Sequence, residues 1–223
     1  MKKVFLGVGH GGSEPGAVAN GFVEKDLNLT IALACRDELE RHGVNVLMSR
    51  TKDENDTLTE EIRECNAYNP DLAVDIHNNA GEGDGCEAFY YHKGGTGKTL
   101  AQNILANLIL IGQNSRGIKT RLNSSGTDYY GFIRETKAPA VIVECAFLDN
   151  KTDLQIIDTE AEQKAMGVAI AKGILLTLGI EYTPPAPQKL YKVQVGAFKN
   201  KSGAENLLAE LKTKGYNGFI VEA

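Results

Sequence analysis

The sequence predicts an α/β protein in which a mixed, mostly parallel sheet is covered by helices on both faces, followed by a small C-terminal β-α-β unit. Three observations predict this fold. Short apolar segments typical of strands alternate with segments of helical periodicity as far as residue 178. The segment YTPPAPQK at 182–189 then interrupts both patterns with three prolines. Beyond it, strand, helix and strand patterns occur once more. We therefore divide the 223 residues into a domain at 1–180, a linker at 181–189 and a unit at 190–223.

The elements of the domain follow from periodicity and from signals at their ends. The apolar run at 3–8 predicts the first strand, and the 3.6-residue period at 25–41 predicts a helix that ends at Gly43. Thr57 and Glu60 have the spacing of a capping box, which predicts the start of the next helix. The remaining elements are expected as strands at 44–49, 72–77, 86–91, 132–134 and 140–145, and as helices at 57–68, 99–111 and 160–178.

The composition argues against several classes of protein. A net charge of −5 offers no basic surface, so we expect no nucleic acid partner. The chain has no run of about 18 apolar residues, and we expect no membrane insertion. Met1 is followed within two residues by the first strand, without the apolar core of a signal peptide, which predicts synthesis in the cytoplasm. The four cysteines are scattered, which favours buried free thiols over a zinc ribbon or disulfides.

Two glycine-rich loops resemble phosphate-binding sequences in part. Residues 7–12, GVGHGG, have the spacing of a dinucleotide-binding loop, but about a dozen further residues precede the next helix, where that motif requires a helix at once. The strand at 44–49 also lacks the acidic residue that binds ribose. Residues 94–99, GGTGKT, resemble the end of a P-loop, but His92 stands where the first glycine is required. A nucleotide-binding oxidoreductase is therefore kept only as an alternative.

Three residues favour a metal centre over a nucleotide site. His10 and His77 stand at the carboxyl ends of two predicted strands, and Glu24 directly precedes a helix. In an open α/β sheet, the carboxyl ends of parallel strands share the edge at which sites form. Two imidazoles and one carboxylate are a common set of ligands for catalytic zinc, with a fourth position left for water. Each residue also has a structural explanation, as a hydrogen-bonded loop residue or as a partner of the helix dipole.

Glu144 adds a fourth ionisable group at the same edge. It follows the apolar run Ala-Val-Ile-Val in a strand that should be buried on both faces. A buried carboxylate is costly unless a metal, a partner or a proton compensates its charge. The position of Glu144 therefore indicates a functional role.

With these residues the chain resembles, over about residues 3–178, the zinc-dependent N-acetylmuramoyl-L-alanine amidases of the family called amidase type 3. The family's Asp-Pro-Gly-His-Gly-Gly corresponds to 7–12, and its Glu-Lys-Asp-x-Asn-Leu is intact at 24–29. Its Ser-Ile-His-x-Asn-Ala corresponds to 75–80. The later blocks, Leu-Arg, Pro-Ala and Val-Glu-x-Gly-Phe-x-x-Asn, correspond to 133–134, 139–140 and 143–150.

The resemblance implies an enzyme and its chemistry. His10, Glu24 and His77 would hold one Zn²⁺, and Glu144 would be the catalytic carboxylate. The implied substrate is bacterial peptidoglycan, at the amide between N-acetylmuramic acid and L-alanine. Zinc would polarise the carbonyl and acidify a water, while Glu144 would accept the water's proton and pass it to the leaving amine.

The chain also departs from the family pattern. Gly7-Val8 stands in place of Asp-Pro, Asp75 in place of Ser, and Cys145-Ala146 where a glycine commonly precedes the phenylalanine. None of these changes removes a ligand or the acid, so we expect activity to survive. The loss of the first-block aspartate does remove a carboxylate that can support the geometry of a histidine ligand.

Further expectations concern the substrate and the place of action. Arg134 and Asn79 are expected to contact substrate, although a salt bridge is an alternative role for Arg134. The enzyme is expected to reach the wall after release, during phage lysis or lysis of a mother cell. A non-catalytic cell-wall-binding module is the alternative from another class.

The C-terminal unit resembles the opening of sporulation-related repeat (SPOR) domains, which bind glycan strands lacking stem peptides. Val193 and Val195 should pack on a helix, so the alternating Lys192 and Gln194 are expected to face a glycan. A second strand is expected at 219–221. The expected helix face consists of Ala204, Leu207, Leu208 and Leu211.

This unit supplies only one of the two β-α-β halves of such a domain. It falls below the roughly 40 residues that a chain usually needs to fold unaided. An isolated β-α-β unit leaves strand edges and an apolar face uncovered, so we expect two C-terminal segments to pair in a homodimer. The alternative is a docked strand and helix without a binding role.

Overall fold

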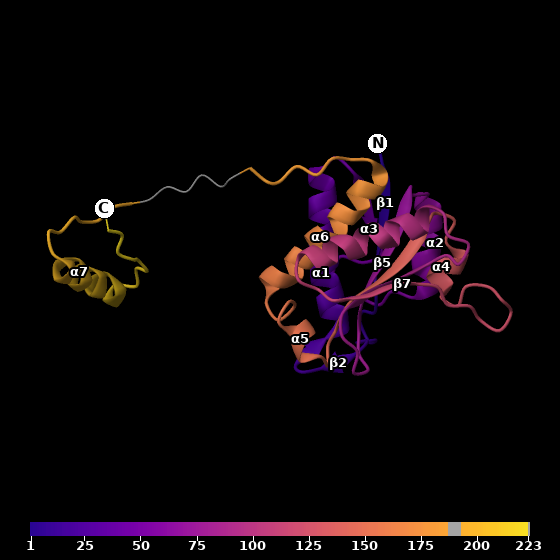
Figure 1. Ribbon diagram of the computed structural model, residues 1–223, viewed down its shortest axis with the longest axis horizontal. Helices are drawn as coiled ribbons and strands as arrows, with labels where there is room; N and C mark the ends of the chain where they lie inside the picture. Colours follow the sequence, from indigo (N-terminus) through magenta and orange to yellow (C-terminus); the bar gives the residue numbers. More distant parts are fainter. Residues whose placement is uncertain (187–192, 223) are drawn as a thin grey trace. The chain divides into compact units, whose positions relative to one another are not determined.

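The computed structural model describes residues 1–186 and 193–222, and the chain divides into two compact units, Met1–Thr183 and Pro184–Ala223. The first unit, coloured from indigo to orange in Figure 1, contains a six-stranded sheet, and its strand order is β4-β1-β5-β8-β6-β7. Its strands are β1 (Lys3–Val8), β4 (Asn45–Met48), β5 (Leu72–Asn79), β6 (Cys86–Tyr90), β7 (Ser115–Lys119) and β8 (Ala140–Phe147).

The direction of the strands confirms the mixed, mostly parallel sheet. Strands β4, β1, β5 and β8 run parallel to one another, whereas β6 runs antiparallel to β8 and β7 runs parallel to β6. The carboxyl ends of β1, β5 and β8 therefore meet at one edge of the sheet. This edge is where a site is expected in such a fold.

Helices cover both faces of the sheet, as predicted. The helices α1 (Glu24–Arg41), α3 (Thr96–Leu110) and α6 (Glu160–Leu178) pack on one face, and α2 (Leu58–Tyr68) and α4 (Gly131–Glu135) on the other. The alternation along β1 shows why two cores form, because Val4 and Leu6 belong to the first core and Phe5 to the second. Each such side chain contributes about 1.5–3 kcal/mol when fully buried.

Local signals set the ends of the helices. The capping box predicted at the start of α2 is present, because Thr57 and Glu60 exchange side-chain and backbone hydrogen bonds. Gly43 follows α1 with a φ of 73°, in the left-handed region that was expected at this position. All four cysteines are free and buried. Among the helices of the described residues, none combines the length and the apolar composition needed to cross a bilayer.

The structure corrects the prediction of a strand at 132–134, since these residues belong to the short helix α4. Phe132 and Ile133 are both buried in the second core, which one helical turn achieves as well as a strand. Two adjacent apolar residues cannot distinguish the two conformations. Three further parts of the fold are short and were not predicted from the sequence: β7, the two-stranded pair β2 (Val18–Ala19) and β3 (Phe22–Val23), and α5 (Lys151–Leu154).

The second unit contains one helix, α7 (Lys201–Thr213), among its described residues. The Asn200 side chain accepts a hydrogen bond from the backbone N–H of Gly203 and so caps this helix. The predicted β-α-β unit is wrong in its strands, because residues 193–222 contain none around Val195 or at 219–221. A strand needs a partner ladder, and one half-repeat supplies too few strands for a stable sheet. Lys192 lies outside the described residues.

Candidate metal centre

The glycine-rich loop after β1 brings His10 to the carboxyl edge of the sheet. His10 adopts a φ of 62°, and a Cβ on the preceding Gly9 would lie 2.2 Å from Cε1 of His77. Gly9 therefore clears space for an imidazole. The next long helix, α1, begins only at Glu24, so Gly12 opens no helix that could bind a pyrophosphate. This arrangement argues against the nucleotide-binding alternative.

A buried arginine fixes the same loop. Arg50 follows β4 and is 2% exposed. Its guanidinium donates to the carbonyl oxygens of Val8 at 3.1 Å, Gly9 at 3.3 Å and Lys25 at 2.7 Å. These bonds tie the end of β1 to the start of α1, and they orient the two segments that carry His10 and Glu24.

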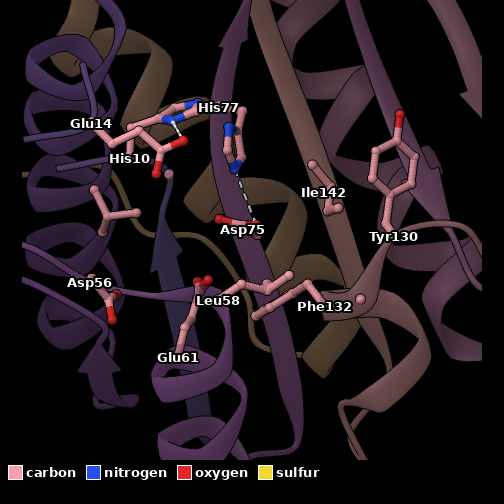
Figure 2. Close-up of a pocket in the computed structure, with 13 residues that line it drawn as sticks. His10, Glu14, Asp56, Leu58, Glu61, Asp75, His77, Tyr130, Phe132 and Ile142 are labelled. Carbon is pink, nitrogen blue, oxygen red and sulfur yellow. Dashed lines mark hydrogen bonds and ion pairs between the residues drawn. The ribbon is translucent and has the colours of Figure 1, made fainter. Parts of the chain in front are cut away.

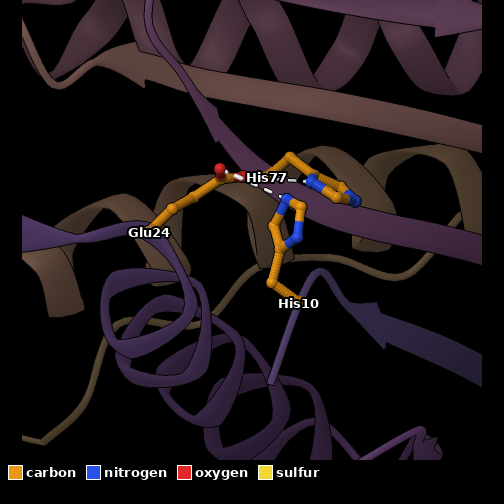
Figure 3. Close-up of side chains that lie close together, drawn as sticks. All are labelled: His10, Glu24 and His77. Atoms are coloured by element: carbon orange, nitrogen blue, oxygen red, sulfur yellow. Dashed lines mark hydrogen bonds and ion pairs between the residues drawn. The ribbon is translucent and has the colours of Figure 1, made fainter. Parts of the chain in front are cut away.

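The structure brings His10, Glu24 and His77 together, although they come from a loop, a helix start and a strand (Figure 3). Oε2 of Glu24 lies 3.2 Å from Nε2 of His10, and Oε1 lies 3.1 Å from Nδ1 of His77. One donor atom from each residue lies within 4.8 Å of the others. The three predicted ligands therefore face a common point.

The Glu24 carboxylate is buried and oriented by the backbone. Burial alone raises the pKa of this carboxyl, but hydrogen bonds from His10 and His77 outweigh it and hold the pKa well below its ordinary value. The backbone N–H groups of Ala17 and Asn78 donate to it at 2.8 and 3.2 Å. Glu24 is thus an ionised acceptor between two imidazoles.

The donor set fits a divalent zinc ion. Two imidazole nitrogens and one carboxylate oxygen are a common protein ligand set of catalytic zinc. The hydrogen bond with Glu24 raises the pKa of His10. Burial lowers the pKa of His77, but the neighbouring Asp75 and Glu24 outweigh burial and raise this pKa to well above its ordinary value. Both imidazoles therefore lie where positive charge is stabilised, and a cation can take the place of their protons.

Glu144 lies beside this group on β8. In the sheet register it stands opposite His77 on β5 and opposite Glu87 on β6. Its Oε2 atom is buried and has no hydrogen-bond partner among the described residues. Burial raises the pKa of Glu144 to about 7. A carboxyl group with this pKa suits proton transfer near neutral pH.

Two further carboxyl groups, which were not among the predicted site residues, lie behind His77. Oδ2 of Asp75 lies 3.2 Å from Nε2 of His77, and Glu61 of α2 lies beyond Asp75 (Figure 2). The sequence carried one signal, because residues two apart in a strand share a face and Asp75 precedes His77 by two. For Glu61 the signal was its spacing in α2, three residues after Leu58 and four before Cys65, which places it on the apolar face of this helix.

A cavity of about 230 Å³ opens at this centre. Figure 2 shows His77 and Tyr130 on either side of Ile142, with Asp75 between His77 and Glu61. The lining is acidic and apolar, as its residues show: Val8, Gly9, His10, Glu14, Asp56, Leu58, Glu61, Asp75, His77, Tyr130, Gly131, Phe132 and Ile142.

The residues expected to contact substrate do not converge on the metal centre in the way the three ligands do. The Arg134 guanidinium donates to the carbonyl oxygens of Asp128 at 2.8 Å and Tyr129 at 2.9 Å, and it pairs with Glu135. Asn79 ends β5, and its side chain accepts from the backbone of Ala80. Gln194 is exposed in the second unit. Contact of these residues with substrate or glycan stays a prediction.

Comparison with known proteins gives two family matches. The model of the N-acetylmuramoyl-L-alanine amidase family Amidase_3 matches residues 4–175, and that of the SPOR domain matches 187–223. The chain is 35% identical to the N-acetylmuramoyl-L-alanine amidase CwlM of Bacillus licheniformis, over 99% of this chain and 85% of the relative. It is 33% identical to the sporulation-specific N-acetylmuramoyl-L-alanine amidase of Bacillus subtilis, with the same coverage of 99% and 85%.

A solved structure shares the fold of the first unit. Cwp6 from Clostridium difficile matches with a TM-score of 0.78 and 41% identity, over 79% of this chain and 29% of that chain. The amidase AmiC2 of Nostoc punctiforme matches with a TM-score of 0.73 and 26% identity, over 80% of this chain and 97% of that chain. The α/β sheet and its helices are therefore those of known amidases.

Proposed function

The chain belongs to the N-acetylmuramoyl-L-alanine amidases and carries a SPOR domain, and from this premise we propose that its catalysis depends on one Zn²⁺ held by His10, Glu24 and His77. As a peptidoglycan hydrolase it acts on the bacterial cell wall. The observation that carries the proposal is the convergence of one donor atom from each of the three residues within 4.8 Å, beside Glu144 with its buried Oε2 atom.

The proposed mechanism gives each group one task. Bound zinc supplies a Lewis acid that polarises the scissile carbonyl and makes water a better nucleophile at neutral pH. Glu144 accepts the proton of the attacking water and returns it to the leaving amine of L-alanine. Its buried, unpartnered oxygen supports this role, because the pKa of about 7 lets one group act as base and then as acid.

Metal analysis combined with digestion of purified peptidoglycan tests the proposal. The zinc-loaded chain should release new L-alanine amino termini without new reducing sugars, and it should contain one zinc per chain. His10→Ala should lose the metal and the activity together. Reducing sugars alone would indicate a glycosidase, and full zinc content in His10→Ala would remove His10 from the ligand set.

The two units have separate proposed roles. We infer that residues 1–180 form the catalytic domain, 181–189 the linker and 190–223 the glycan-binding unit, with Lys192 and Gln194 as contacts. The SPOR match supports wall binding. The sporulation-specific relative supports lysis of a mother cell as the occasion for release, beside phage lysis.

Pairing of two C-terminal units into a homodimer stays a prediction. Its support is the exposure of apolar residues in this unit, among them Phe198 at 49% and Phe219 at 76%. Light scattering of the full chain at micromolar concentration tests it. A monomeric mass would contradict the prediction.

A further inference from the structure

The buried carboxyl groups of Asp75 and Glu61 lie directly behind His77. Asp75 is 3% exposed and Glu61 is 7% exposed. One oxygen of Asp75 is paired with Nε2 of His77, while its Oδ1 atom and Oε1 of Glu61 have no hydrogen-bond partner among the described residues. Figure 2 shows the Glu61 carboxyl directed toward Asp75. Burial of acids is expensive, so this arrangement calls for a function.

Gly7 provides the room for both acids. In the pairing of β1 with β5, Gly7 stands directly opposite Asp75. A Cβ on Gly7 would lie 2.0 Å from Oε1 of Glu61 and 2.7 Å from Oδ1 of Asp75. Any side chain at position 7 would therefore displace the two carboxyl groups.

The two departures from the family pattern meet at this point. The aspartate of the first block is replaced by Gly7, and the serine of the third block is replaced by Asp75. The two positions face each other in the sheet register. Compared with the family pattern, this chain therefore has its carboxylate on β5, at Asp75, and not on β1, at position 7. It remains beside His77 in the new position.

The contact with Asp75 decides which nitrogen of His77 faces the centre. A carboxylate accepts hydrogen bonds, so Nε2 carries the proton that lies between His77 and Asp75. The other nitrogen, Nδ1, faces Glu24 at 3.1 Å, and a bound cation would take the place of the proton on this nitrogen. His10 has weaker support, since its outer nitrogen faces Glu14 at 3.4 Å and that side chain is 73% exposed.

We propose that Asp75 is a positioning residue that holds His77 with Nδ1 toward the metal, and that Gly7 and Glu61 enclose Asp75 away from water. The inference rests on the proposed zinc site. Carboxylates that accept the second N–H of a histidine ligand fix its orientation and raise its basicity, and their loss typically costs 10–100-fold in metal affinity or activity. Asp75 acts through His77 and touches no substrate in this proposal.

Zinc affinity of the full chain tests the proposal without relying on turnover. Competition with a chromogenic chelator should show Asp75→Ala binding zinc about 10–100-fold more weakly than the natural chain. Asp75→Asn keeps an oxygen that can accept the N–H, and it should recover most of that loss. The visible spectrum of the cobalt(II)-substituted protein should change in Asp75→Ala, because the ring of His77 is no longer held.

A matched control separates this effect from the loss of any buried aspartate. Asp128 is 2% exposed and accepts from Nδ1 of His92 at 2.7 Å, outside the three ligands. Asp128→Ala should therefore leave zinc affinity and the cobalt spectrum unchanged. Thermal unfolding of the metal-free variants shows whether each one folds.

Several results would overturn the proposal. Asp75→Ala with the zinc affinity and cobalt spectrum of the natural chain would do so, and so would equal losses in Asp75→Ala and Asp128→Ala. If Asp75→Ala does not fold, Asp75→Ser should show the weakened affinity, and adding Gly7→Asp with Glu61→Ala should restore it. Failure of that restoration contradicts the proposal. A natural chain that binds no zinc would instead contradict the proposed function itself.

Discussion

The half-buried Glu144 side chain has one buried oxygen, Oε2, which lacks a hydrogen-bond partner among the described residues. A carboxylate used only for structure would be expected to have its hydrogen bonds satisfied. The unsatisfied oxygen and the raised pKa are the features of a group that exchanges protons.

Glu144→Gln should abolish hydrolysis and leave the metal in place. The amide is nearly isosteric with the carboxyl group but cannot accept the proton of water, and loss of general acid–base catalysis typically costs 10²–10⁴-fold in rate. The release of L-alanine amino termini and the zinc content are the two measurements. Undiminished turnover would remove Glu144 from the mechanism, and loss of zinc would place it among the ligands.

The acid side of the pH profile should report the ionisation of Glu144. Burial raises its pKa, the charge of His77 lowers it, and Glu24, Asp75 and Glu87 raise it to about 7 in the metal-free protein. Bound zinc adds positive charge, so the midpoint in kcat/KM should lie between the ordinary 4.5 and about 7, with activity lost as pH falls.

A substitution at the neighbouring strand checks this assignment. Glu87 stands opposite Glu144 and pairs with Arg116 at 2.8 Å. Glu87→Gln removes a negative charge and frees a positive one, so it should move the acid midpoint to lower pH. A midpoint that stays in place, or moves to higher pH, would assign the titration to another group.

At the scale of elements, two glycines let helices approach each other closely. Gly167 of α6 lies against α1, where a Cβ would come 2.3 Å from the carbonyl oxygen of Ile31. Gly173 lies against α3, where a Cβ would come 2.5 Å from the Cα atom of Ile104. The three helices on this face of the sheet pack with backbones in contact, and α1 carries Glu24 at its first turn.

Gly167→Ala should therefore destabilise the protein, although alanine is the better helix former by about 1 kcal/mol. The added methyl meets backbone of α1, and such overpacking typically costs about 1–3 kcal/mol in the free energy of unfolding. Urea unfolding of the zinc-loaded protein measures the change. Lys164→Ala, on the exposed part of α6, is the control and should stay within about 0.5 kcal/mol. A more stable Gly167→Ala would contradict the close contact.

The sequence predicts elements well where their signals are local. The capping box at Thr57 and the left-handed Gly43 are set by residues close in the chain, and both are present. The two residues Phe132 and Ile133 were predicted as a strand, because their helical conformation depends on packing against distant residues. The strands of the C-terminal unit were predicted from alternation alone, which cannot supply a pairing partner.

The candidate site divides in the same way. His10, Glu24 and His77 could be selected because strand ends and a helix start can be read from local patterns, and the topology then brings them together. The spacing of Asp75 and Glu61 places them on buried faces of their elements, but their meeting behind His77 depends on the register that places Gly7 opposite Asp75. Contacts across strands and helices far apart in the chain carry no local signature.

At the scale of the whole molecule, the two units should be separable in function. A chain that ends at Thr183 keeps the sheet, its helices and the cavity, which all belong to the first compact unit. It should cleave a soluble muramyl peptide at about the rate of the full chain, because all residues of the candidate site belong to the first unit. Its sedimentation with purified glycan strands lacking stem peptides should be lost. Retained binding would assign glycan recognition to the first unit.

The ligands from residues 10, 24 and 77 have a mechanical consequence as well as a chemical one. A cation that joins them would cross-link the loop between β1 and α1 to strand β5. Stripping the metal should then loosen this stretch before the rest of the fold gives way, so that a protease nicks the chelated protein first between residues 11 and 23.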